Sequence, residues 1–118
     1  MKEMANACSN PDCGKQLMAV QDALGVLGGK WKIPIICVLA YYKKMGFKEL
    51  QREIGGITSK MLSKELKDLE ANLLVNRTVL DTRPITVKYE MTPYGISTTD
   101  IITELYHWGV AHRKQVMT

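Results

Sequence analysis

The chain has 118 residues, 46% of them hydrophobic and 24% charged, which is the composition of one globular domain. This length excludes a large enzyme with separate cofactor and substrate domains. A net charge of +4 favours an anionic partner, and nucleic acid is the commonest one.

Signals for secretion and membrane insertion are missing from the sequence, which predicts a cytoplasmic protein. Residues 1–10 lack the apolar segment of a signal peptide. The longest apolar run, residues 33–42, is far shorter than a membrane span and contains Pro34. The three cysteines are an odd number, which argues against a disulfide scaffold.

The chain is predicted to begin with a flexible polar N-terminal segment, residues 1–14, followed by a single domain, residues 15–118. The domain starts with an amphipathic helix that ends at Gly28-Gly29. Its apolar residues recur three and four positions apart, at Leu17, Val20, Leu24 and Leu27.

A second helix is expected to begin near Trp31. Pro34 fits its first turn, where the backbone N–H has no helical partner to lose. Residues 35–39 are apolar nearly all round the helix, which predicts a buried central element. Cys37 lies in this run and is predicted to be an inert core residue.

Two short helices joined by a glycine turn follow, which is typical of a helix-turn-helix motif. The first spans about residues 47–54 and ends at Gly55-Gly56. The second spans about residues 58–72 and is capped by Thr58 or Ser59. Four leucines form its apolar stripe: Leu62, Leu66, Leu69 and Leu73.

The hydrophobic period then changes from helical to alternating. Residues 75–80 and 85–91 are predicted strands, and residues 81–84 supply the turn of a β-hairpin. A long last helix starts at Thr92-Pro93 and carries a stripe of Ile101, Leu105, Trp108 and His112. The predicted fold is therefore mainly α with a small β-hairpin wing, a winged helix-turn-helix.

The helix at residues 58–72 is predicted to enter the major groove of DNA as a recognition helix. Its side opposite the leucines holds hydroxyl and ammonium groups, which can bind phosphates and base edges. These residues are Ser59, Lys60, Ser63, Lys64 and Lys67. Such a face is often merely solvated, but the glycine turn before it and the hairpin after it favour DNA.

Further basic residues are candidate DNA contacts. In the wing, at about residues 75–91, Arg77, Arg83 and Lys88 can reach the flanking minor groove or phosphates. Lys30 and Lys32 stand at the start of the second helix, where the free N–H groups already favour a phosphate.

The two terminal helices need a surface against which to bury their apolar stripes. A second copy of the chain supplies one and doubles the DNA contacts, so a homodimer is predicted. The alternative is that both helices fold back on their own domain. The predicted interface residues are Leu17, Val20, Leu24, Ile101, Ile102, Leu105 and Trp108.

Several ordered blocks resemble the HxlR-type transcriptional regulators, relatives of the MarR group. Residues 24–32 resemble the family's L-x-x-I-G-G-K-W signature. Further matches are residues 46–50, 56–63, 66–70, 75–79, 84, 87–89 and 91–95. The resemblance runs from about Leu17 to Trp108. It implies a dimeric, non-catalytic, operator-binding repressor or activator built on the first and last helices, with the wing around Arg83 and with Ser59, Lys60, Ser63 and Lys64 facing the major groove.

One departure from the family concerns its sensing cysteine. Many members carry C-P-V at the start of the first helix, where this chain has Met18-Ala19-Val20. Thiol sensing therefore does not follow from the resemblance. Cys13 lies beside Lys15, whose charge favours a thiolate, and with Cys8 forms a candidate redox pair. The alternative is two ordinary cysteines in the polar N-terminal segment.

A metal-responsive regulator is one alternative to the DNA-binding function alone, and it would use Cys8, Cys13, His107 and His112. Their spacings are unlike those of zinc sites, and no metal or cofactor is predicted. The motifs of common enzyme classes are missing from the sequence. A protein-interaction module that uses the winged fold without DNA is the more serious alternative, and a small-molecule effector is left open.

Overall fold

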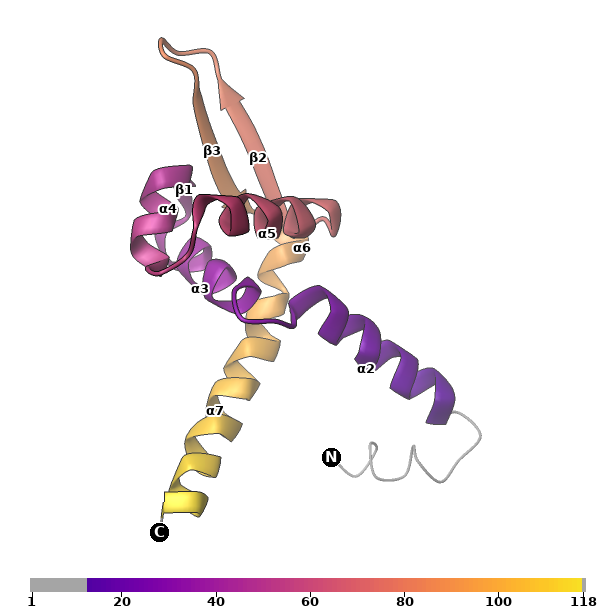
Figure 1. The fold of residues 1–118 in the computed structure, drawn as a ribbon. Coiled ribbons are helices and arrows are strands. Elements are labelled where there is room, and N and C mark those ends of the chain that lie inside the picture. The colour runs from indigo at the N-terminus through magenta and orange to yellow at the C-terminus, as the bar shows by residue number, and fades with distance from the viewer. Residues whose placement is uncertain (1–12, 118) are drawn as a thin grey trace.

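The computed structural model describes residues 13–117, and two helices extend away from the remaining elements (Figure 1). The elements are α2 (Cys13–Leu27), α3 (Lys32–Tyr42), β1 (Lys44–Gly46), α4 (Phe47–Ile54), α5 (Ser59–Ala71), β2 (Val75–Leu80), β3 (Thr86–Met91), α6 (Pro93–Ile96) and α7 (Thr98–Met117). We call α3 to α6 the body and α2 and α7 the arms. The hairpin β2–β3 extends from one side of the body and the arms from the other.

This order of elements confirms the predicted fold, a mainly helical winged helix-turn-helix. The bounds of α2, α3, α4 and α5 lie within two residues of those expected from the hydrophobic periods. Gly55 and Gly56 form the turn between α4 and α5 with φ angles of 75° and 71°. Such positive φ values cost glycine little because it has no Cβ.

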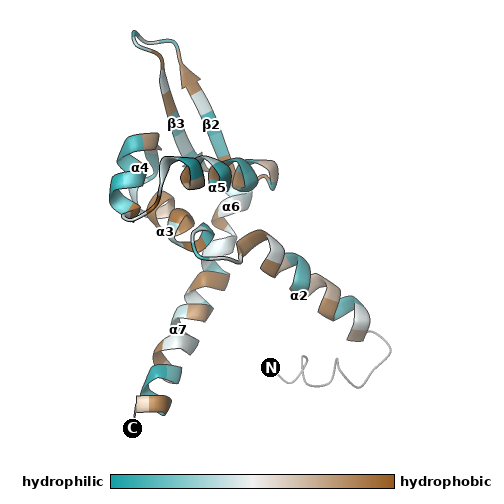
Figure 2. Cartoon of the chain, in the orientation of Figure 1, coloured by the Kyte–Doolittle hydropathy of each residue, from teal (hydrophilic) through white to brown (hydrophobic). Residues whose placement is uncertain are grey.

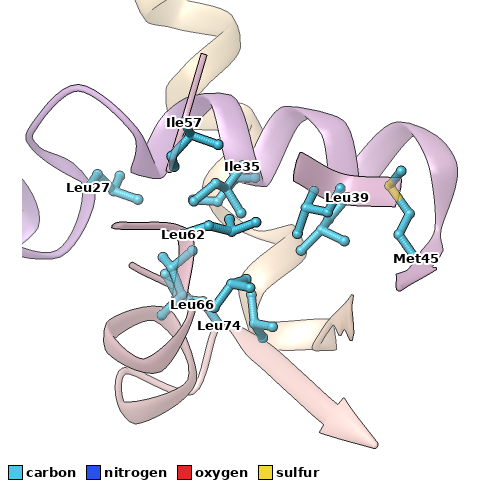
Figure 3. Close-up of a cluster of buried hydrophobic side chains, with 12 residues drawn as sticks. Leu27, Ile35, Leu39, Met45, Ile57, Leu62, Leu66 and Leu74 are labelled. Atoms are coloured by element: carbon cyan, nitrogen blue, oxygen red, sulfur yellow. The ribbon is translucent and has the colours of Figure 1, made fainter. Parts of the chain in front are cut away.

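The core of the body lies where α3 crosses α5. Ile35 and Leu39 of α3 point toward Leu62 and Leu66 of α5, and all four are at most 2% exposed (Figure 3). Burying one such aliphatic side chain contributes about 1.5–3 kcal/mol. This shared core fixes the position of α5 on the body.

Two residues predicted to lie in apolar cores are exposed instead. Cys37 is on the outer side of α3, because Ile36 and Leu39 take the inward positions. Leu73 follows the end of α5, has a positive φ of 66° and is 68% exposed. The chain turns at this point, so Leu74 enters the core in its place.

The sheet has one strand that periodicity did not predict. β1 pairs antiparallel with β3, and Met45 lies opposite Tyr89, which gives the strand order β1-β3-β2. A strand of three residues is too short to show an alternating pattern. It ties the base of the hairpin to the start of α4.

The last helix is broken into α6 and α7 rather than continuous. Ser97, Thr98 and Thr99 follow one another at the break, and each hydroxyl donates to a carbonyl three residues earlier. Such bonds compete with regular helical geometry. Before the break, Gly95 packs so closely that a Cβ there would lie 2.1 Å from the Leu74 carbonyl oxygen.

Candidate nucleic-acid interface

The amino-terminal end of α5 is held by side-chain hydrogen bonds. Thr58 Oγ1 accepts from the Met61 N–H at 3.1 Å, which confirms the predicted cap. Gln51 Nε2 of α4 donates to the Ile57 carbonyl at 3.1 Å and to Ser59 Oγ at 3.2 Å. Sequence reasoning missed Gln51, because nothing in a single sequence marks a bond between two helices.

The outward side of α5 is polar and basic, as predicted. Ser59, Lys60, Lys64 and Lys67 are exposed and Ser63 is half-buried. Lys64 Nζ lies 3.5 Å from Asp68 Oδ2, an exposed pair one helical turn apart that contributes little stability. These ammonium groups can therefore be redirected toward an anion at small cost.

The hairpin adds cationic groups beside α5. Arg77 on β2 and Arg83 at the tip are both exposed. A hollow of about 260 Å³ separates α5 from the hairpin, with Lys67 on one wall and Arg77 on the other. Ser63, Leu66, Glu70 and Tyr89 complete its lining. Two cations facing one hollow are suited to an anion such as a DNA phosphate.

Lys88 is engaged in an ion pair at the surface of the body. Its Nζ lies 3.1 Å from Glu49 Oε1, and the same oxygen accepts from the Gly46 N–H at 3.1 Å. The Gly46 N–H, followed by the Lys88 charge, holds the pKa of Glu49 below its ordinary value. Lys88 thus links β3 to α4.

The two lysines before and in α3 have different surroundings. Lys30 is exposed, and its Nζ lies 4.8 Å from the centre of the Trp31 ring. Lys32 was expected at a phosphate, but it is only 9% exposed and points toward α5. Its Nζ lies 2.5 Å from Glu65 Oε2, so the ammonium is engaged with α5 and is not free at the surface.

Hydrophobic residues recur along both arms (Figure 2), and most of the predicted dimer residues are exposed there. These residues are 37–63% exposed: Leu17, Val20, Leu24, Ile101, Leu105 and Trp108. His112 stacks on Trp108 with ring centres 4.8 Å apart. Ile102 differs, because it is half-buried against the core of its own body.

The cysteines and histidines form no metal site in the part of the chain that the structure describes. No group of three His, Cys, Asp or Glu side chains among residues 13–117 is placed to hold a metal ion. Cys8 lies outside the described residues, and Cys13 is half-buried at the start of α2. Although Cys37 is exposed, partial desolvation of its thiol by the surrounding side chains raises its pKa, which disfavours the reactive thiolate.

None of the described helices is long and apolar enough to cross a membrane by itself. α2 and α3 meet that requirement only as a pair bent by 68°.

A family model and known regulators match this chain. The model for HxlR-like helix-turn-helix proteins matches residues 26–117. The HTH-type transcriptional regulator YtcD of Bacillus subtilis is 41% identical over 102 residues, which cover 86% of this chain and 80% of YtcD. The regulator YodB of the same organism is 37% identical over 90 residues, which cover 76% of this chain and 80% of YodB.

Solved structures of regulators have the same fold. The crystal structure of YtcD has a TM-score of 0.76 at 40% identity, covering 80% of this chain and 96% of that one. The redox regulator HypR in its reduced form has a TM-score of 0.76 at 33% identity, covering 83% of this chain and 96% of the HypR chain. A MarR-family regulator from Enterococcus faecalis has a TM-score of 0.75 at 30% identity, covering 84% of this chain and 89% of that regulator.

Proposed function

This chain belongs to the HxlR-like helix-turn-helix family of transcriptional regulators, and on that premise we propose that it is a cytoplasmic homodimer that binds a specific duplex DNA operator. In this proposal α5 lies in the major groove, and the wing around Arg83 contacts the flanking minor groove or phosphates.

The observation that carries the proposal is the placement of exposed cations on α5 and the hairpin. Lys60, Lys64 and Lys67 of α5 are exposed, Arg77 lies across a hollow from Lys67, and Arg83 is exposed at the hairpin tip. Helix residues near the amino-terminal end reach base edges, while residues farther along and on the wing meet the backbone. The proposed direct contacts are Lys30, Ser59, Lys60, Ser63, Lys64, Lys67, Arg77 and Arg83.

The exposed apolar stripes of the arms support the dimer. Leu24 and Trp108 are 63% and 61% exposed, which is unusual for large apolar side chains that recur along helices. A second copy would cover both stripes through a self-complementary contact. Two bodies held in this way would present two α5 helices to one duplex.

A binding measurement tests the proposal. A duplex is enriched by the wild-type protein from a random 30-base-pair pool, and its affinity is compared with that of a scrambled duplex by fluorescence anisotropy. We expect selective binding that weakens steeply with salt, since lysines and arginines displace the counterions of phosphates. Failure to enrich any duplex would contradict DNA binding and favour a protein-interaction module.

Single substitutions then locate the contact surface. Lys60→Ala and Lys64→Ala are each expected to weaken binding by about tenfold and to lower the salt slope by about 0.9. Lys114→Ala is the matched control, because Lys114 is also exposed but lies near the end of α7. Equal losses in all three variants would contradict the assigned surface.

A further inference from the structure

Lys32 occupies a position that is electrostatically unfavourable for a lysine. It is the first residue of α3, where the helix dipole favours negative charge, and the first turn of α3 holds no acidic residue. Its side chain is nevertheless turned inward, whereas that of Lys30 is exposed. The charge of Lys32 therefore has to be balanced by another element.

The balancing charges come from α5. Lys32 Nζ lies 2.5 Å from Glu65 Oε2 and 3.4 Å from Asp68 Oδ2, and these two carboxylates are nearly one helical turn apart. The hydrogen bond to Glu65 raises the pKa of Lys32 although burial opposes this, so the ammonium stays charged. Glu65 is itself only 9% exposed. A buried charge pair thus joins the start of α3 to the middle of α5.

Asp68 connects this buried pair to the candidate DNA surface. Its Oδ2 is shared between Lys32 and the exposed Lys64, which lies 3.5 Å away on the outward side of α5. When Lys64 moves to a DNA phosphate, Asp68 keeps Lys32 as a partner. Without Lys32, Asp68 would compete with the DNA for Lys64, and Glu65 would be a buried carboxylate without its closest cation.

We infer that Lys32 is a positioning residue for DNA recognition and not a DNA contact. It pairs with two carboxylates of the recognition helix and fixes the rotation of that helix against α3. This role rests on the proposed function of α5. The sequence alone did not predict the ion pairs of Lys32 with Glu65 and Asp68.

The Lys32→Met variant tests the inference, because methionine keeps much of the side-chain volume but carries no charge. Affinity is measured for the enriched duplex and for its scrambled control. We expect a loss of about tenfold for the enriched duplex and less than about threefold for the scrambled one, since base contacts need a fixed helix orientation and phosphate attraction does not. The salt slope should stay unchanged.

The rescuing variant is Lys32→Met combined with Glu65→Gln, which has the net charge of the wild type. We expect it to recover selectivity to within about threefold, since it leaves no unpaired buried carboxylate at position 65. Glu65→Gln combined with Lys114→Met is the matched control. Lys114 lies in the last turn of α7 and outside the proposed contacts, so no comparable gain in selectivity is expected there.

Each outcome separates the inference from the proposed function. If the wild type enriches no duplex, DNA binding itself is wrong. If the wild type binds selectively but Lys32→Met lowers the salt slope by about 0.9, Lys32 contacts a phosphate and the inference is overturned. Unchanged selectivity in Lys32→Met, or equal recovery by Glu65→Gln in both lysine backgrounds, also overturns it. Should Lys32→Met alone fail to fold, the double variant is compared directly with the wild type by the same two readouts.

Discussion

The body and the arms contain similar apolar side chains at similar helical spacing, yet their surroundings are opposite. In the body, Ile35 and Leu62 are completely buried. In the arms, Leu24 and Trp108 are more than half exposed. The core of the body is thus complete within one chain, whereas the apolar stripes of the arms stay uncovered, as the proposed dimer requires.

The largest expected effect comes from truncating the core of the body. Leu62→Ala should lower the free energy of unfolding by about 2–5 kcal/mol, because it leaves a cavity where α5 meets α3. Urea unfolding measures this loss. A loss below about 1 kcal/mol would mean that the body is not the stable unit of the molecule.

A smaller loss is expected at the junction between the body and α7. A Cβ at Gly95 would meet the Leu74 carbonyl oxygen at 2.1 Å, so Gly95→Ala should cost about 1–3 kcal/mol. Gly25→Ala is the control, because a Cβ there meets nothing within 4 Å and alanine favours a helix. Urea unfolding of both variants checks the prediction, and equal stability would contradict the close approach at Gly95.

Truncating an arm should change self-association more than the stability of the body. Trp108→Ala is expected to weaken dimerisation by roughly tenfold or more, since large aromatic residues dominate interfaces. Ile85→Ala is the control, because Ile85 is 68% exposed but lies beside the hairpin turn. Sedimentation equilibrium distinguishes the two, and equal dissociation constants would contradict the assignment of the arms.

The smallest effect concerns the exposed pair that ties the hairpin to α4. The folded-state pKa of Glu49 is lowered, so its contribution is present above its ordinary pKa of about 4.5 and is lost as the pH falls through the folded value. Glu49→Gln should therefore reduce the slope of stability against pH below about pH 4.5 and leave the slope at neutral pH unchanged. Urea unfolding at about five pH values between 3 and 7 measures this slope. An identical acid slope in both proteins would contradict a role for this pair.

The fold was largely predictable because periodicity identifies both long helices and alternating strands. The glycine turn and the Thr58 cap follow from local chemistry. β1 was missed because three residues show no pattern, and the exposure of Cys37 was missed because an apolar run does not reveal which side faces the core.

The candidate site was predictable only where it is exposed. Lys60 and Lys64 lie on the predicted side of α5, because helical spacing alone places them there. The roles of Lys32 and Lys88 depend on carboxylates 33 and 39 positions away in the sequence. Such pairings between distant elements leave no signature in one sequence.

The central claim is that two bodies read one operator because the arms hold them together. Sedimentation velocity of the wild type, alone and with the enriched 30-base-pair duplex, tests it most directly. We predict a dimer at micromolar concentration and two chains bound to each duplex. A monomer in free solution, together with one chain on each duplex, would contradict the account.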